Sequence, residues 1–154
     1  MSSSPAGSAF KPAFAGFADM VRASFAKQGM LQAIGARLVS IEPGQCRIDL
    51  PYSDAVSQQQ GFFHGGAIGA IGDVAAGYAA YSLMPQGSEV LTVEYKINLV
   101  KAARPPLLLA EAQVLRAGRT LTVCRSEVFR VEGSDRELCA VLQATMMRVE
   151  PAVR

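Results

Sequence analysis

The chain has a single histidine, His64, followed directly by a glycine pair, Gly65 and Gly66. An apolar stretch comes next, and its only charged residue is Asp73. A carboxylate inside an apolar helix is unfavourable unless it is hydrogen-bonded, because the buried charge loses its hydration. Backbone N–H groups at the start of the same helix have no helical partner, and they favour a negative oxygen. These residues predict a carboxylate base or nucleophile and an oxyanion donor, the components that acyl transfer requires.

The spacing of these two groups predicts a site shared between subunits. Asp73 follows Gly65 by eight residues, which is about 12 Å along one helix at about 1.5 Å per residue. A reacting carbonyl carbon must lie about 3 Å from both groups. Two antiparallel copies of the helix across a two-fold axis would bring Gly65 of one copy beside Asp73 of the other. If the two residues do not serve one reaction, Asp73 is instead a structural carboxylate that faces solvent or a local partner.

The elements that position these residues follow from hydropathy and turn signals. The alanine-rich stretch from Gly65 to the residues before Pro85 predicts a helix, and its apolar circumference predicts burial on all sides. Strand-like segments are expected at about 34–42, 45–51, 91–99, 106–116, 120–132 and 137–149. An amphipathic helix, from Phe14 to about Lys27, precedes them. Short links between the strands predict an α+β fold with a curved, largely antiparallel sheet around the buried helix.

Composition excludes several other classes of protein. With 154 residues, half of them hydrophobic, we expect a loose tail over residues 1–12 and one domain over residues 13–150. The net charge of +2 is too small to indicate a nucleic-acid partner. Cys46, Cys124 and Cys139 have neither CxxC spacing nor an even count, which favours reduced thiols in a cytoplasmic protein. No apolar segment is long enough to predict a membrane span.

A longer motif resembles a known family. The pattern Gln58-x-x-Gly61-x-x-His64-Gly65-Gly66, with Asp73 nine residues after the histidine, resembles the hotdog-fold acyl-CoA thioesterases of the phenylacetate-pathway (PaaI-like) type. The resemblance covers about residues 30–149, including "VEYKINLVKAA" after the helix and "GR" at 118–119. It implies a long central helix wrapped by an antiparallel sheet, hydrolysis of an acyl-CoA thioester, and a homodimer that often pairs into a tetramer.

The resemblance also implies roles for particular residues. Asp73 either attacks the thioester or activates water, and the Gly65 N–H is the oxyanion donor, with Gly66 as a second candidate. Gln58, which stands where this family usually has Asn, orients water or the thioester. His64 braces the loop, and Thr92 helps to hold water near the carboxylate.

Other residues are candidates for substrate binding. Large apolar residues near the motif and on the helix are expected to line an acyl pocket: Phe62, Phe63, Tyr78 and Leu83. Cations near strand ends are expected to meet the phosphates of coenzyme A: Lys101, Arg104 and Arg119. No metal site is expected, because His64 has no second histidine to join it. No cofactor is expected either, because coenzyme A is part of the substrate.

Two other functions fit the same fold. A hotdog hydratase or dehydratase would use His64 with a carboxylate as an acid–base pair, although its proline-rich helix start is absent here. A dimeric acyl-CoA sensor would use the same pocket without depending on Asp73. Hydrolysis of a fatty or aromatic acyl-CoA is the favoured interpretation.

Overall fold

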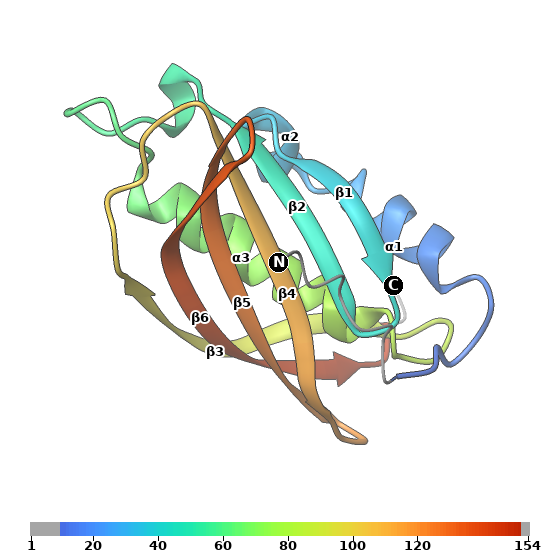
Figure 1. The fold of residues 1–154 in the computed structure, drawn as a ribbon. Helices are drawn as coiled ribbons and strands as arrows, with labels where there is room; N and C mark the ends of the chain where they lie inside the picture. The colour runs from blue at the N-terminus through green and yellow to red at the C-terminus, as the bar shows by residue number, and fades with distance from the viewer. Residues whose placement is uncertain (1–9, 152–154) are drawn as a thin grey trace.

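The central element is a long apolar helix, α3 (Gly65–Tyr81), in the computed structural model, which describes residues 10–151. Alanine, glycine and isoleucine dominate its 17 residues. Such a helix has no broad polar face, so it is stable only where other elements cover it. The structure shows it in the concave side of one curved sheet (Figure 1).

Six antiparallel strands form that sheet in the order β1-β2-β4-β5-β6-β3. Their bounds are β1 (Arg37–Glu42), β2 (Gln45–Pro51), β3 (Glu89–Leu99), β4 (Leu107–Ala117), β5 (Leu121–Glu132) and β6 (Asp135–Val149). Side chains that alternate into the concave face pack on α3 and form the apolar core, with Ile48, Leu108, Val128 and Leu142 fully buried. The predicted α+β fold, a curved antiparallel sheet around a long helix, is confirmed.

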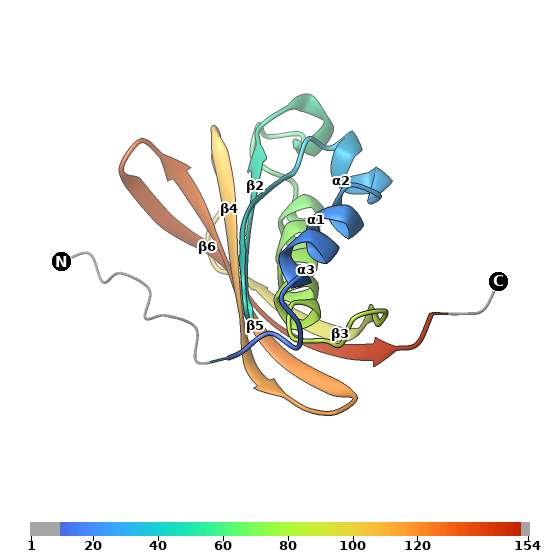
Figure 2. The same ribbon diagram turned by 90° about the vertical axis from the view of Figure 1, so that its right-hand side faces the viewer.

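Two short helices form a further layer, α1 (Phe17–Phe25) and α2 (Gly29–Ala33). They lie on the side of α3 that faces away from the sheet (Figure 2). The predicted amphipathic helix therefore exists but begins at Phe17 rather than Phe14. Strand β1 begins at Arg37 rather than at residue 34, because α2 extends to Ala33 and Gly35, two residues later, has a left-handed φ of 78° that stops the helix. A single 3-10 turn, Asp54–Val56, lies in the loop before α3.

The predicted tail, residues 1–12, falls mostly outside the described range. At its end, Phe10 packs against the apolar core. The three cysteines are free and buried, and burial raises the pKa of the Cys46 and Cys124 thiols. None of the helices in residues 10–151 has the length and hydropathy needed to cross a membrane.

One expectation about α3 is wrong for the single chain. The helix is not buried all round, because Gly66 is exposed and Asp73, Val74 and Gly77 are only half-buried. These residues lie along one side of the helix, next to the edge strand β3. The sheet and the α1–α2 layer pack against other parts of the helix, so this side is where a ligand or a second chain could reach α3.

Strand β3 carries a bulge that changes which side chains face α3. Thr92 pairs with Met146 and Glu94 pairs with Thr145, so Val93 is the extra residue. Thr92 and Tyr95 consequently lie opposite Met146 and Ala144 of β6, which are fully buried. Simple alternation would have placed Thr92 and Tyr95 on opposite faces of the strand.

Two buried serines, Ser82 and Ser126, differ in how their hydroxyls are bonded. The Ser82 Oγ accepts a hydrogen bond from the Gly44 N–H at 2.8 Å and donates one to the Ala79 carbonyl at 2.7 Å. The Ser126 Oγ is equally buried and has no hydrogen-bond partner within residues 10–151. Removing a hydroxyl that is hydrogen-bonded leaves its buried partner unpaired, which lowers the free energy of unfolding. Removing a hydroxyl that has no partner does not.

We expect Ser82→Ala to lower the free energy of unfolding by about 1–3 kcal/mol, because it leaves the buried Gly44 N–H without an acceptor. Ser126→Ala is the matched control, and we expect it to leave that free energy unchanged or to raise it. Urea unfolding at one fixed protein concentration measures both. Equal destabilisation by the two substitutions would contradict the assignment of these hydroxyls.

Candidate active site

His64 organises the start of α3 as its N-cap residue. Its Nδ1 accepts a hydrogen bond from the Gly66 N–H at 2.8 Å, and its carbonyl accepts from Ala67 and Ile68. Because Nδ1 is the acceptor, the neutral ring carries its proton on Nε2. This arrangement satisfies one of the N–H groups that every helix start leaves unpaired.

The Gly65 N–H is a free donor at the same helix start. Within residues 10–151 it has no hydrogen-bond partner, whereas the Gly66 N–H is taken by His64. The helix dipole adds partial positive charge at this point, which favours a negative oxygen. The geometry therefore makes the Gly65 N–H, rather than that of Gly66, the group available to bind an oxyanion.

A cavity of about 350 Å³ opens beside the Gly65 N–H. Gln58, Phe62, Leu99 and Lys101 are among the residues that line it. The Gln58 amide contacts Gln60 at 3.4 Å. Six candidate residues from the sequence thus gather at this end of α3: Gln58, Phe62, Phe63, His64, Gly65 and Lys101.

The other aromatic and cationic candidates near this cavity have clear contacts. Phe63 is buried and packs edge-on against Tyr52, with ring centroids 5.1 Å apart, so it supports the loop from beneath. The Arg104 guanidinium lies 5.5 Å from the centroid of the Phe62 ring. The Lys101 Nζ lies 2.5 Å from a carboxylate oxygen of Glu137.

The Asp73 side chain reaches from α3 to the bulged strand β3. The Thr92 hydroxyl donates a hydrogen bond to its Oδ1 at 2.9 Å and lies 3.5 Å from the Met146 sulfur. Burial raises the pKa of Asp73 above the ordinary aspartate value, and the bond from Thr92 opposes that rise. Within residues 10–151, Oδ2 has no hydrogen-bond partner, so it is free to accept a proton or to attack carbon.

Asp73 and Thr92 open into a second cavity, also of about 350 Å³, which is separate from the Gly65 cavity. The seven residues between Gly65 and Asp73 keep the two cavities apart along α3. One chain therefore holds the oxyanion donor and the carboxylate at two places rather than at one.

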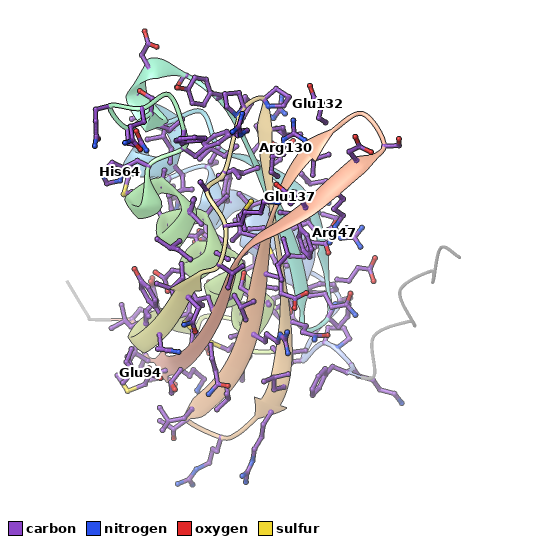
Figure 3. All side chains as sticks on the ribbon, turned by 60° about the vertical axis from the view of Figure 1, so that its left-hand side comes forward. Arg47, His64, Glu94, Arg130, Glu132 and Glu137 are labelled. Atoms are coloured by element: carbon purple, nitrogen blue, oxygen red, sulfur yellow. The ribbon has the colours of Figure 1, made fainter. Side chains whose placement is uncertain are left out.

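Arg119 and Leu83 line neither the Gly65 cavity nor the Asp73 cavity. Both line a smaller cavity beside Met84 and Arg148, at the far end of α3. In Figure 3, His64 lies at the start of α3, whereas the charged residues Arg130, Glu132 and Glu137 lie on β5 and β6.

Sequence reasoning missed two polar residues that line the Asp73 cavity, Ser24 and Gln28. They belong to α1 and to the residue before α2, and no motif marks them. Helical spacing does not relate them, because α1 ends at Phe25 and Gln28 is the extended N-cap of α2. Their proximity comes from hydrogen bonds that both make to Tyr78.

Comparison with known proteins identifies the family. Residues 60–136 match the thioesterase superfamily. A crystal structure of a thioesterase family protein from Silicibacter pomeroyi is 38% identical, with a TM-score of 0.86 over 88% of this chain and all of that one. The chain belongs to the thioesterase superfamily. The predicted membership of the hotdog thioesterases, and with it the class of thioester hydrolases, is confirmed.

More distant relatives of this thioesterase agree with that assignment. A 1,4-dihydroxy-2-naphthoyl-CoA hydrolase from Listeria monocytogenes is 24% identical over 72% of this chain and 89% of its own length. The PaaI protein from the phenylacetic acid degradation operon of E. coli is 19% identical, with a TM-score of 0.76 over 86% of this chain and 96% of that one. The likeness to the PaaI protein shows a shared fold.

We expect the Asp73 carboxyl to titrate above the ordinary aspartate pKa, and Thr92→Val to raise its pKa further. The reason is that the hydroxyl bond stabilises the ionised carboxylate, whereas burial destabilises it. Carbon-13 NMR of side-chain carboxyl groups across a pH series measures both values. Thr145→Val is the control, because the Thr145 hydroxyl bonds Glu94 instead. A Thr92→Val spectrum with the wild-type titration would refute this account.

Proposed function

We propose that this thioesterase hydrolyses acyl-CoA thioesters to a free acid and coenzyme A, at two sites that each combine residues of two subunits. The observation that carries the proposal is the separation of the free Gly65 N–H from the Asp73–Thr92 pair along one helix. The Gly65 cavity has no carboxylate of Asp73 in its lining, and the Asp73 cavity has no Gly65 N–H in its lining. A second copy of the chain supplies what is missing.

The symmetry of α3 and β3 supports a particular dimer. Gly69 lies midway between Gly65 and Asp73, so a two-fold axis at Gly69 puts each Gly65 opposite the partner's Asp73. A Cβ at Gly69 would lie 3.5 Å from the Tyr95 hydroxyl, so the same axis passes near Tyr95 of the edge strand.

Pairing of β3 with its own copy about Tyr95 would have complementary charges. Glu94 of one chain would lie opposite Lys96 of the other, and both residues are exposed in the single chain. Figure 3 shows Glu94 on this edge strand. Leu91, Val93 and Leu99 are each more than half exposed, which is unusual for large apolar residues and supports coverage by a partner. The β3 pairing that has complementary charges is therefore also the one that puts Gly65 of each chain opposite Asp73 of the other.

The chemistry follows from the two half-sites. The thioester carbonyl oxygen gains negative charge as the tetrahedral intermediate forms, and the Gly65 N–H would stabilise it by about 3–4 kcal/mol. Asp73 of the other chain would activate water or attack the carbonyl carbon through its free Oδ2. Thr92 would hold Oδ1 and so fix the direction of the second oxygen. The raised pKa of Asp73 makes the ionised carboxylate a stronger base.

The cationic residues fit the phosphates of coenzyme A unequally. Lys101 lines the Gly65 cavity and pairs with Glu137, whereas Arg104 lies against the Phe62 ring, which also lines that cavity. A phosphate there would compete with Glu137 for the Lys101 ammonium. Arg119 lies with Arg148 at the other end of α3, so its predicted contact with phosphate would have to be made at a different point of the nucleotide.

We expect Asp73→Asn to lower kcat for acyl-CoA hydrolysis by about 10²- to 10⁴-fold, since the amide is neither a base nor a nucleophile. Release of free thiol from short, long and aromatic acyl-CoAs measures the rates. Full activity in this variant would overturn the mechanism, and tight binding without turnover in the wild type would indicate a sensor instead.

Gly65→Pro tests the oxyanion donor, because it removes the N–H at a first helical position, where proline is tolerated. The control is Gly65→Ala, which keeps the N–H; its Cβ would meet only the flexible end of Leu99, at 3.0 Å. We expect Gly65→Pro to lose about 10²- to 10³-fold in kcat and Gly65→Ala to remain active.

Mixing the two inactive variants tests the shared site. A heterodimer of Asp73→Asn and Gly65→Pro chains has one site with both groups intact, so a statistical mixture recovers about a quarter of wild-type activity. Co-expression with different affinity tags and a thiol assay measure the recovery. A mixture as inactive as its parents would rule out sites that combine Gly65 and Asp73 of different chains.

A further inference from the structure

A cluster of charged side chains adjoins the Gly65 cavity, and one carboxylate lies among its cations. Glu137 is directly opposite Arg130 in the pairing of β5 with β6, so the two side chains point to the same face of the sheet (Figure 3). The Lys101 Nζ donates to a Glu137 carboxylate oxygen at 2.5 Å, and Lys101 also lines the Gly65 cavity. Together with Arg104, these residues form the Glu137 cluster: Lys101, Arg104, Arg130 and Glu137.

Backbone contacts hold the Glu137 cluster in place. The Lys101 N–H donates to the Cys139 carbonyl of β6 at 3.2 Å. The Arg130 Nε donates to the carbonyl of Pro105, the residue after Arg104, at 3.3 Å, and the Arg130 side chain is only 19% exposed. The link between β3 and β4 is thus held against β5 and β6, so the cations are positioned before a ligand binds.

Positive charge exceeds negative charge in this part of the protein. Glu137 is one carboxylate among three cations, and a second carboxylate, that of Glu132, bonds Arg130. The hydrogen bond from Lys101 lowers the pKa of the Glu137 carboxyl, and the charges of Lys101, Arg130 and Arg104 lower it further. A phosphate group offers more acceptor oxygens than a carboxylate, and Lys and Arg are the side chains that bind it. The Glu137 cluster is therefore suited to an anion of this kind.

Glu137 and a phosphate would compete for the same cations. A phosphate beside an ionised Glu137 would be repelled by its charge, so binding favours displacement of the carboxylate from Lys101. The side chains of Lys101 and Glu137 are 58% and 39% exposed, so they can separate without rearrangement of the core. The ion pair would form again when the phosphate leaves.

We propose that Glu137 is a built-in competitor of the phosphates of coenzyme A: it pairs with Lys101 in the free protein, a phosphate displaces it, and its return promotes release of the product. The proposal rests on the proposed function, because it assigns the Gly65 cavity to coenzyme A. It makes Glu137 a residue that weakens coenzyme A binding and thereby speeds product release.

Glu137→Gln tests the competition, because it keeps the length of the side chain and removes its charge. We expect the variant to bind free coenzyme A about threefold to fivefold more tightly than the wild type, since an exposed ion pair has about that effect on an equilibrium. Calorimetry with coenzyme A measures the affinity. An ion pair with only a structural role gives no gain, so an affinity equal to or below that of the wild type would overturn the proposal.

Two further variants show whether the gain comes from Lys101. Glu127→Gln is the matched control, because Glu127 forms an ion pair of the same 2.5 Å length with Arg125 and lines a different cavity. Its affinity for coenzyme A should equal that of the wild type, and an equal gain would overturn the proposal. In a Lys101→Met background, Glu137→Gln should raise the affinity less than it does alone. A gain of undiminished size would refute competition at Lys101.

Truncated ligands identify the phosphate that displaces Glu137. Dephospho-coenzyme A lacks the 3′-phosphate, and pantetheine lacks every phosphate. Pantetheine, followed by NMR titration, should bind the wild type and Glu137→Gln equally, and a gain with it would overturn the proposal. A gain that is lost with dephospho-coenzyme A assigns the displacement to the 3′-phosphate. A gain that is kept assigns it to the pyrophosphate.

Binding and turnover together separate this proposal from the proposed function. If no acyl-CoA is hydrolysed but coenzyme A binds Glu137→Gln more tightly than the wild type, hydrolysis fails as the function and the competition stands. If acyl-CoA is hydrolysed and both proteins bind coenzyme A equally, the competition is overturned and hydrolysis stands.

Discussion

The structure depends on one constraint, which is that α3 has no broad polar face. A helix of this composition must be enclosed, and a strongly curved sheet does this for most of its circumference. Small residues let the sheet approach closely: a Cβ at Gly72 would already lie 3.4 Å from side chains of Val128 and Leu142. Polar chemistry is then confined to the start of the helix and to the side next to β3. The position of the candidate site is thus a result of how the helix is covered.

Much of this fold could be predicted from the sequence, because its signals are local. The apolar stretch and the alternating strands gave the central helix, the sheet and nearly all the turns between them. The short helix α2 was missed, because five residues are too few to establish a helical period. The bulge in β3 was missed for a different reason. Apolar and polar residues alternate without interruption from Leu91 to Leu99, and the extra residue exists only because of how β3 fits against β6 and α3.

The candidate site was predictable to the same extent. Motif residues from Gln58 to Gly65 do gather at one end of α3, because they are close in sequence. The role of His64 as a cap that uses the Gly66 N–H depends on a side-chain rotamer, which no spacing rule specifies. Gln28 and Tyr78 are 50 residues apart, so their contact depends on tertiary packing. Arg119 is distant from the Gly65 cavity because the turn that carries it is at the other end of the strands.

The partial burial of Asp73 has a consequence for the stability of the fold. Its pKa is higher in the folded chain than in the unfolded chain, so the unfolded chain loses this proton first as the pH rises. The stability associated with this carboxyl is fully present below the unfolded pKa and is lost as the pH rises through the folded pKa. The folded state is therefore weakened in the same pH range in which Asp73 becomes ionised and able to react. A neutral residue at this position would remove this pH-dependent loss of stability, and it would remove the carboxylate with it.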